Sequence, residues 1–582
     1  MQNSKLRMTL VPVGWMLGGV ALALGLTYGL SRNSSNLPLA PLALPSSQQA
    51  QNLDAPAPTS EFPRLAAAHY FGRDWPKNFI AGFRREHVAE DFAQLREDGF
   101  NSVILLVSWG DFQPQIEPCC RDDERAYERL RFLLDAARNA GLKVVLRIGY
   151  GWSFHPDVPS SHHRLHLLTN SAAVRQSFMR FVERIARELG DHPQVQLSFM
   201  SWEDQTLQRI EPEARVDFER FLSTLPERER NQLGLDAATP VSEVPLPTRG
   251  GTDAALFHRY WDWLKRDQLY VPAQQRLPAM SYEVRVDKEP APGDKPGEYR
   301  WIGHEASYEL PGAAVLTVYW APYWGAQNQG EKLSAEDSAR LFGGMLKSVR
   351  AVEAQKPIFI DQFNVIDNTP GHEHNASLRP DALPAFLPLA HCLMRAHRVP
   401  AYALWTWREY GESPLANPSF GYGLESWESQ GAVKLEALPG GDFEAVLGPQ
   451  SELVQAIPAE RGRMPGIRGE DTEVCVDAVA EAGSVLSVSV LGMHEPRVLR
   501  FAQDGRQRAC VAVARATDPT GQRLRLIAGA KTIRLRNVQY VDHWQAGGVR
   551  DPAGQPGPYL QAFQRFNREF LQERAPARCE AG

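Results

Sequence analysis

The chain has 582 residues, of which 43% are hydrophobic and 23% charged, and its formal net charge at pH 7 is -6. These values are typical of a globular protein with room for one large domain and a smaller one. The charges are interspersed along the chain. This gives no electrostatic reason to expect nucleic acid as a partner and favours small molecules or neutral polymers.

The N-terminus predicts a membrane anchor. Lys5 and Arg7 precede an uncharged stretch, 8–30, which is long enough to span a bilayer as a helix. We therefore expect residues 1–32 to be a signal anchor or a signal peptide, followed by a Pro/Ser-rich linker at 33–62. The favoured interpretation is an uncleaved transmembrane helix in the inner membrane, with the rest of the chain exported to the periplasm or beyond. The alternative is secretion after signal cleavage.

Residues 63–430 alternate short apolar runs with amphipathic helical segments, which is the pattern of parallel βα units. Eight candidate strands predict a closed (β/α)8 TIM barrel. The strands are expected at 66–71, 102–108, 143–148, 195–200, 279–284, 314–319, 357–361 and 401–406. Helices are expected at 85–98, 126–140, 171–189, 254–267, 335–354 and 382–397. Gly99, Gly141 and Gly190 mark the ends of three of these helices.

Residues 431–582 change to short alternating strands separated by Gly and Pro turns, which predicts an antiparallel β-sandwich. The strands are expected at 484–491, 498–502, 510–514, 523–527 and 532–540. An amphipathic segment at 559–571 is expected to pack on one of the two domains. Cys475 and Cys510 both lie in this region and could form a disulfide in an oxidising compartment.

Two of the predicted barrel strands end in carboxylates. The strand at 195–200 leads into Glu203, and the strand at 357–361 ends in Asp361. The carboxyl ends of barrel strands meet at one rim, where such side chains face each other. Two carboxyl groups across a cleft are the minimal apparatus for cleaving a glycosidic bond. Glu203 and Asp361 are therefore the candidate catalytic pair.

The strand ends also carry aromatic and charged residues that we expect to contact a ligand. Flat aromatic faces suit sugar rings, and charged groups can hydrogen-bond hydroxyls. A single Trp is more often a packing residue, but clustering at several strand ends favours binding. The candidate substrate-binding residues are Trp109, Arg147, Trp152, Trp202, Asp204, Glu283, Arg285, Tyr319, Trp320, Gln362, Trp405 and Trp407. No set of metal ligands, phosphate loop or Ser nucleophile elbow stands out, so neither a metal nor a cofactor is expected.

The order of these motifs resembles glycoside hydrolases of clan A, the cellulase-like (β/α)8 enzymes. The residues that carry the resemblance, spread over 65–430, are 92–103, Trp109, Gln113, Pro114, Arg147, Glu203, Tyr319, 357–364 and Trp405. In that clan the general acid/base is a Glu at the end of strand four, and the nucleophile is a Glu at the end of strand seven. The resemblance thus implies a retaining glycosidase in which Glu203 is the acid/base.

Two positions depart from the pattern of the clan. Trp202 stands where an Asn usually precedes the acid/base, and Gln362 falls at the position of the nucleophile. A neutral amide cannot form the usual glycosyl ester. The neighbouring Asp361 could take that role only if the strand bulges by one residue, because successive side chains of a strand point to opposite faces.

Three interpretations of the acidic residues remain open. In the first, Glu203 and Asp361 lie about 5–5.5 Å apart and retain configuration at the sugar. In the second, Glu203 or Asp204 works with Glu283 or Asp287 across a wider gap that admits water and inverts configuration. In the third, the barrel binds glycans without cleaving them.

A structural salt bridge is an equal alternative for two of these acids. Asp204 and Asp361 could each pair with an arginine of the rim, such as Arg147 or Arg285. We predict hydrolysis of O-glycosidic bonds in a polysaccharide or oligosaccharide at a bacterial-type cell envelope. The alternatives are a non-catalytic glycan-binding barrel that handles exopolysaccharide, and a glycan-modifying transferase that uses the same site.

Overall fold

The computed structural model describes residues 62–573 except 117–119, 150–160, 191, 201–208, 237, 278, 287, 293–298, 322–330, 366–376, 458–471, 491–494, 514–521, 542 and 546. The predicted anchor and nearly all of the predicted linker lie outside these residues. None of the helices in the described part of the chain is long and apolar enough to cross a membrane. Residues 55–582 form one compact unit.

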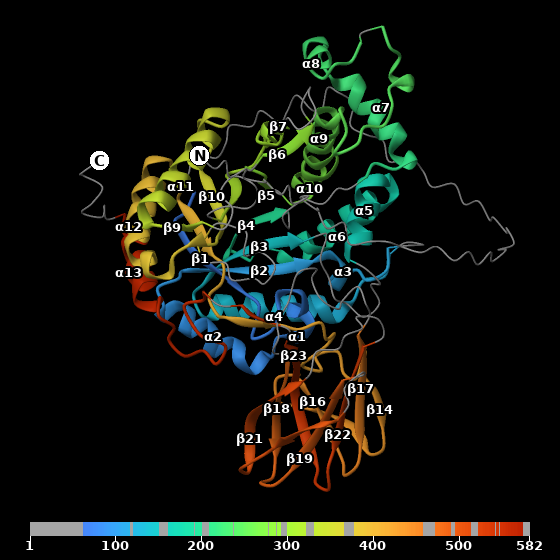
Figure 1. Ribbon diagram of the computed structural model, residues 1–582, viewed down its shortest axis with the longest axis vertical. Coiled ribbons are helices and arrows are strands. Elements are labelled where there is room, and N and C mark those ends of the chain that lie inside the picture. The colour runs from blue at the N-terminus through green and yellow to red at the C-terminus, as the bar shows by residue number, and fades with distance from the viewer. Residues whose placement is uncertain are drawn as a thin grey trace, which may run out of the picture. The chain divides into compact units, whose positions relative to one another are not determined.

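Within the described residues, eight parallel strands close into a barrel, which confirms the predicted architecture (Figure 1). Each strand lies within two residues of its predicted position, and β12 returns beside β1 to close the ring. The strands are β1 (Leu65–Tyr70), β2 (Ser102–Ser108), β3 (Lys143–Gly149), β4 (Val195–Met200), β5 (Met280–Val284), β8 (Leu316–Trp320), β10 (Ile358–Phe363) and β12 (Ala401–Leu404).

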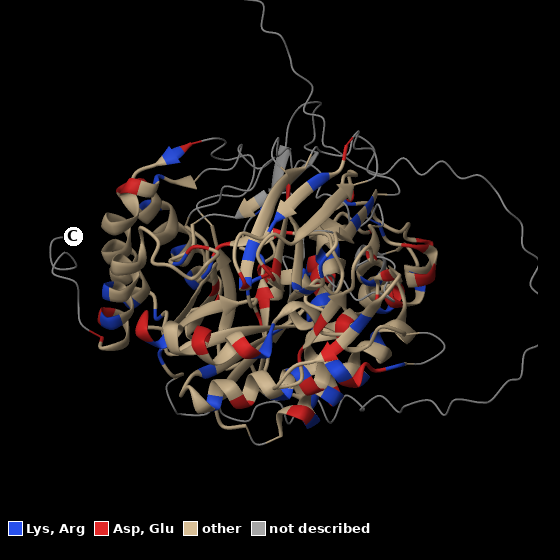
Figure 2. Cartoon of the chain, turned by 90° about the horizontal axis from the view of Figure 1, so that it is seen from below, with Lys and Arg blue, Asp and Glu red and all other residues tan. Residues whose placement is uncertain are grey.

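Amphipathic helices surround the strands, and acidic and basic residues are interspersed over the described elements (Figure 2). The helices between consecutive strands are α1 (Phe79–Gly82), α2 (Arg85–Glu97), α3 (Trp109–Phe112), α4 (Glu124–Asn139), α5 (Ser161–Asn170), α6 (Ala172–Leu189), α10 (Val271–Arg276), α11 (Ala335–Val352) and α12 (Leu383–Ala396). The hydroxyls of Ser171 and Ser334 accept from backbone N–H groups in the first turns of α6 and α11, which fixes where these helices begin. Gly99 follows α2 with a φ of +86°, a conformation that favours glycine.

A helical insertion with its own core follows β4. It contains α7 (Arg215–Thr224), α8 (Glu227–Gln232) and α9 (Ala254–Trp263), and it packs Phe218, Phe221 and Tyr260 together. The helix predicted at 254–267 changes at residue 264 to a π-helix, Leu264–Tyr270, that continues into α10. Pro272 explains the change, because it lacks an N–H and its ring would clash with a carbonyl of the preceding α-helical turn.

The last helix, α13 (Leu560–Leu571), completes the helical layer of the barrel. Phe566 packs against Phe363 of β10 and Tyr402 of β12, and Asn567 donates to the backbone oxygen of Asp98 at the end of α2. The helix therefore lies between α12 and α2, where the eighth helix of a barrel belongs. The predicted segment 431–582 grouped this helix with the sandwich, but its apolar face contacts the barrel. The β-sandwich is thus inserted between the eighth strand and the eighth helix.

The sandwich consists, in the described part of 428–541, of two antiparallel five-stranded sheets, as predicted. One sheet has the order β14 (Glu428–Gln430), β17 (Glu452–Ile457), β22 (Gln522–Ala528), β19 (Val485–Val490) and β20 (Arg497–Arg500). The other has the order β15 (Val433–Ala437), β16 (Phe443–Leu447), β23 (Ile533–Val541), β18 (Thr472–Ala480) and β21 (Gly505–Val513). Cys475 and Cys510 pair across β18 and β21 and form the expected disulfide.

Among the residues that the structure describes, three strand pairs lie outside the barrel and the sandwich. They are β6 (Glu289–Pro292) with β7 (Tyr299–Ile302), β9 (Lys332–Leu333) with β11 (Ser377–Leu378), and β13 (Tyr410–Glu412) with β24 (His543–Gln545). The last pair joins the chain that follows β12 to the chain that follows β23.

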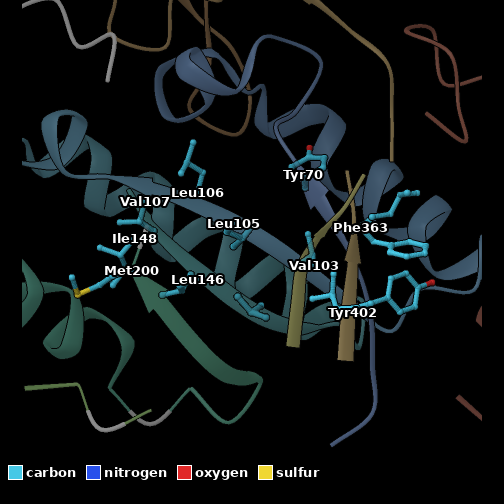
Figure 3. Packing of buried hydrophobic residues seen from close by; sticks show 14 of the residues in the cluster. Tyr70, Val103, Leu105, Leu106, Val107, Leu146, Ile148, Met200, Phe363 and Tyr402 are labelled. Atoms are coloured by element: carbon cyan, nitrogen blue, oxygen red, sulfur yellow. The ribbon is translucent and has the colours of Figure 1, made fainter. Parts of the chain in front are cut away.

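The outward faces of the barrel strands form one large apolar core with the helices. Val103, Leu105 and Tyr402 are buried residues of this core (Figure 3). A second cluster fills the barrel interior toward the amino ends of the strands. Its members include Leu65, Val145, Phe199 and Phe359. Apolar burial on both faces of the strands explains why their sequences read as continuous hydrophobic runs.

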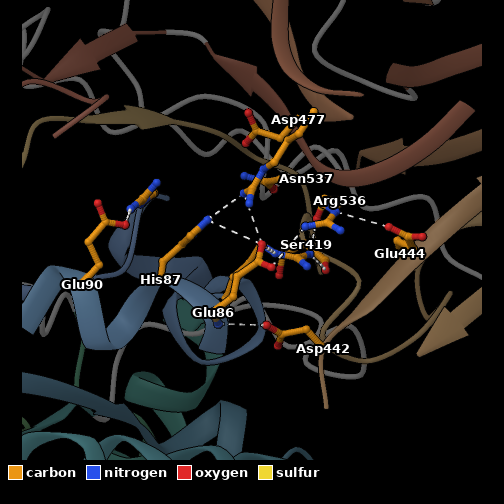
Figure 4. Close-up of polar contacts among 12 residues, drawn as sticks. Glu86, His87, Glu90, Ser419, Asp442, Glu444, Asp477, Arg536 and Asn537 are labelled. Carbon is orange, nitrogen blue, oxygen red and sulfur yellow. Dashed lines mark hydrogen bonds and ion pairs between the residues drawn. The ribbon is translucent and has the colours of Figure 1, made fainter. Parts of the chain in front are cut away.

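Polar contacts join the sandwich to the loop and helix that follow β1 (Figure 4). The buried Arg84 donates to the backbone oxygen of Arg536 in β23 at 2.7 Å, and Glu86 pairs with the side chain of Arg536 at 3.2 Å. Asn537 and Gln539 of the same strand both donate to the carboxyl group of Asp74. One face of the sandwich is therefore attached to the barrel by hydrogen bonds and ion pairs.

Candidate functional site

Charged side chains occupy the barrel interior next to its apolar layer, on the side of the carboxyl ends of the strands. Ala67, Val145 and Phe359 belong to the apolar layer, and the next inward positions on the same strands are His69, Arg147 and Asp361. Glu283 of β5 forms an ion pair with Arg147 in the same layer. We call His69, Arg147, Glu283 and Asp361 the interior cluster. It lies toward the carboxyl ends of the strands, the end of a barrel that carries active sites.

Arg147 is the cation of the interior cluster. Its side chain is fully buried, and Nη2 lies 3.0 Å from Oε2 of Glu283, while Nη1 lies 3.9 Å from Oδ2 of Asp361. Burying an arginine away from water is costly unless acids and hydrogen bonds compensate it. One guanidinium thus faces two carboxyl groups, and the salt bridge expected as an alternative for Asp361 is present.

The surroundings of Asp361 favour its neutral form. Burial and the neighbouring charge of Glu283 raise the pKa of Asp361 well above its ordinary value, and the opposing effect of Arg147 is smaller. Asp361 therefore binds a proton more readily than an ordinary aspartate does. A protonated Asp361 can donate a hydrogen bond or a proton, but it is not a ready nucleophile.

Strand β10 carries one extra residue at the cluster. Ile360 pairs with Val318 of β8, and the next pair in that ladder is Gln362 with Tyr319, so Asp361 is passed over. The ladder with β12 also shifts between Ile360 and Phe363. Phe363 packs outward on α12 and α13, so Asp361 and Gln362 both turn inward. The bulge that Asp361 needs in order to share the barrel interior with Gln362 is therefore present.

Four other predicted residues belong to the same end of the barrel. Gln362 and Tyr319 are paired neighbours on β10 and β8, and both side chains are buried. Arg285 follows Glu283 by two residues and is also buried. Trp405, just after β12, is half-buried, and its ring lies 4.9 Å from the imidazole of His69. An aromatic ring that is partly exposed beside charged groups suits the apolar face of a sugar.

Three tryptophans predicted to bind substrate lie in packed cores instead. Trp109 is fully buried against Phe178 of α6, and its Nε1 donates to the side chain of Gln113. Trp320 faces outward on β8 and packs on Phe342 of α11. Trp407 is buried and donates to Asp98. Because their rings contact helices and core side chains, we correct their predicted role to packing.

The remaining predicted site residues, Trp152, Trp202, Glu203 and Asp204, lie outside the described residues. His69 was missed by sequence reasoning. The alternation along β1 could have found it, because Leu65, Ala67 and His69 occupy alternate positions of one strand and so point to one face. The described residues contain one His/Cys/Asp/Glu group with metal-like spacing, but two of its three members are the disulfide-bonded Cys475 and Cys510.

No protein-family model matches the sequence, and no curated protein matches it. Several solved structures do. An exo-β-1,4-mannosidase from Opitutaceae bacterium strain TAV5 is 16% identical over 60% of this chain and 53% of that chain, with a TM-score of 0.38. A GH5_18 protein from Streptomyces cattleya in complex with GlcNAc is 17% identical over 60% of this chain and 72% of that chain, with a TM-score of 0.38.

An endo-1,4-β-mannanase from Rhizomucor miehei is 10% identical over 59% of this chain and 86% of that chain, with a TM-score of 0.36. The match to the mannosidase spans about half of that chain. The structures found are glycoside hydrolases of clan A, the group that the sequence resembles. At these TM-scores the likeness carries no argument about activity or substrate.

Proposed function

We propose that the barrel hydrolyses O-glycosidic bonds in a polysaccharide or oligosaccharide. The observation that carries this proposal is the interior cluster, in which Arg147, Glu283 and Asp361 are buried together toward the carboxyl ends of the strands. Buried acids at this end of a barrel, one of them with a raised pKa, are typical of a catalytic site. Such a cluster is costly to bury, and packing alone does not require it.

The chemistry needs one acid that donates a proton and one carboxylate that is ionised. In this proposal Glu203, at the end of strand four, is the acid/base, as the resemblance to clan A implies. The second carboxyl group comes from the Asp361–Glu283 pair. The raised pKa of Asp361 disfavours it as the ionised member, so this proposal gives the role of the carboxylate to Glu283, which pairs with Arg147 at 3.0 Å.

A non-catalytic glycan-binding barrel is the second candidate function. It is favoured by one observation, namely that β10 turns toward the interior the neutral Gln362 and Asp361, an acid whose raised pKa favours its neutral form. Such a barrel would hold a glycan through Trp405 and the charged groups without cleaving it.

Activity on a panel of glycans separates the two candidates. The full chain is incubated with neutral, acidic and amino-sugar polysaccharides, and newly released reducing ends are measured. We expect release by the native protein and a loss of at least about a hundredfold in Glu203→Gln, as for removal of a general acid. Binding without release by the native protein, together with gain of cleavage in Gln362→Glu, would support the binder. Longer products in place of free sugars would identify a transferase.

We also propose that the chain acts outside the cytoplasm, anchored by residues 8–30. The apolar stretch after Lys5 and Arg7 supports the anchor, and the Cys475–Cys510 disulfide supports an oxidising compartment. Protease treatment of intact spheroplasts tests the proposal. The barrel should be digested from outside and the N-terminal segment should remain with the membrane fraction. Protection of the barrel until the membrane is lysed would contradict it.

A further inference from the structure

We propose that His69 is a positioning residue that holds the bulge in β10, and so keeps Asp361 and Gln362 both facing the barrel interior. The expected effect on turnover rests on the proposed function. The positioning itself can be measured without any activity.

The contact that carries the proposal is one short hydrogen bond. Nε2 of His69 lies 2.6 Å from the backbone oxygen of Asp361. His69 is on β1 and Asp361 on β10, and β12 lies between these two strands in the barrel wall. The imidazole therefore reaches past one strand to bind the backbone of the next. A carbonyl oxygen only accepts hydrogen bonds, so the proton must be on Nε2.

The accepting carbonyl belongs to the extra residue of the bulge. In the described ladders of β10 with β8 and β12, Asp361 is skipped in both registers. A residue without a register partner leaves its backbone groups outside the regular ladder, and buried backbone groups need a partner elsewhere. His69 supplies that partner for the oxygen of Asp361.

Two features keep the imidazole in this role. Burial and the nearby charge of Arg147 lower the pKa of His69 well below its ordinary value, so the ring stays neutral and keeps a single N–H. Trp405 contacts the ring edge-on at 4.9 Å, and Phe71 stacks at 5.7 Å, which fixes the plane of the ring. A neutral, orientated N–H is a donor whose strength does not change over the physiological pH range.

Without this donor, the regular two-residue alternation of a strand would turn either Asp361 or Gln362 outward. The carboxyl group of Asp361 would then lose its place 3.9 Å from Arg147. His69 thus acts through the backbone of β10, and we do not assign it contact with a reacting atom.

Three variants test the proposal. His69→Phe keeps the ring volume and removes the donor, while His69→Gln keeps an N–H donor on a side chain of similar reach. His391→Phe is the matched control, because His391 is a fully buried histidine of α12 that packs on Phe566 and Phe570 away from the interior cluster. All three are made in the full chain, and thermal unfolding shows which of them fold.

The first readout is hydrogen–deuterium exchange of the peptide spanning 358–364. We expect exchange in His69→Phe to be faster by about tenfold, the size of one lost hydrogen bond. His69→Gln and His391→Phe should stay within about threefold of the native rate. Native-like exchange in a folded His69→Phe would overturn the proposal, and so would exchange in His69→Gln as fast as in His69→Phe.

The second readout is kcat and KM on whichever glycan the native protein cleaves. His69→Phe should lower kcat by about tenfold or more with little change in KM, and His69→Gln should restore it, as expected when a catalytic group is misplaced. If the native protein cleaves no glycan, the proposed function fails while the exchange measurement still decides the role of His69. If the native protein is active and His69→Phe has native kcat, the positioning role fails and the proposed function stands.

Discussion

The interior of the barrel contains a cluster of charged side chains, whereas the core of the β-sandwich is apolar. Inside the barrel, Arg147, Glu283 and Asp361 are at most 2% exposed. Inside the sandwich, the core consists of apolar residues such as Val476, Leu486, Leu524 and Leu535, and ion pairs such as Arg525–Glu452 lie on an outer face. Buried charge lowers stability unless it is fully compensated, so a charged cluster inside a barrel at its carboxyl end is a candidate for function. The difference assigns the chemistry to the barrel and a supporting role to the sandwich.

The largest expected effect comes from the helix that follows the sandwich but belongs to the barrel. Replacing Phe563, Phe566 and Phe570 with Ala should remove about 9–15 kcal/mol, at about 3–5 kcal/mol for each buried Phe, which approaches the whole stability of a domain. We expect loss of the near-ultraviolet circular dichroism signal and of the cooperative thermal transition.

The same helix provides the matched control. Gln561, Arg565 and Arg568 are exposed on its opposite face, and changing all three to Ala should shift the melting temperature by only a few degrees. A triple Phe variant that melts like this control would show that the barrel closes without α13.

The interior cluster should be the next most sensitive point. Arg147→Met leaves two buried carboxyl groups without their cation, which should lower the free energy of unfolding by about 3–5 kcal/mol at pH 7. Urea unfolding measures the change. A loss of unfolding free energy below about 1 kcal/mol at pH 7 would mean that the charge of Arg147 does not stabilise the interior cluster.

The junction between the two regions should depend on pH through Asp74. Burial raises the pKa of this carboxyl group to about 6, despite hydrogen bonds from Asn537 and Gln539. Because the folded pKa is above the unfolded value of about 3.9, the contribution of Asp74 is fully present below about pH 4 and is lost as the pH rises through 6. The change amounts to about 3 kcal/mol at 1.36 kcal/mol for each pKa unit.

Denaturant unfolding between pH 4 and pH 8 checks this dependence. Native protein should lose stability over the range, and Asp74→Asn should remove that part of the slope. Equal slopes for the two proteins would show that Asp74 titrates normally.

The smallest effect is expected on the outer face of the sandwich. Arg525 pairs with Glu452 at 2.6 Å, but its side chain is 52% exposed. An exposed pair of this kind contributes about 0–1 kcal/mol, so Arg525→Met should barely change the unfolding midpoint. Any difference in midpoint between the variant and the native protein should disappear in high salt. Comparison with Arg147→Met then measures directly how differently the two regions use an arginine.

The sequence predicted the barrel well because its strands are buried on both faces. The apolar runs of β2 and β3 are continuous, and the helices that follow them end at Gly141 and Gly190, so the sequence of each segment is compatible with only one type of element. The position of α13 could not be predicted, because an amphipathic pattern shows which face is apolar but not which partner covers it.

The candidate site was predicted less completely. Arg147, Glu283 and Asp361 were identified because acids and arginines at strand ends are unusual in an apolar strand pattern. From the sequence we could say only that Asp361 needs a bulge in order to share the barrel interior with Gln362. The bulge itself could not be predicted, because an extra residue in a ladder depends on pairing between strands that are far apart in sequence. Trp109, Trp320 and Trp407 were placed wrongly, since aromatic residues near a strand end serve packing and binding with the same sequence signal.

The most direct test of the account is glycan cleavage by Glu283→Gln and Asp361→Asn in chains whose folding is verified by thermal unfolding. The account predicts that native protein releases reducing ends and that both variants lose at least about a hundredfold in kcat while remaining folded. Native rates in both folded variants would contradict it, because the buried acids of the barrel would then have no part in the chemistry.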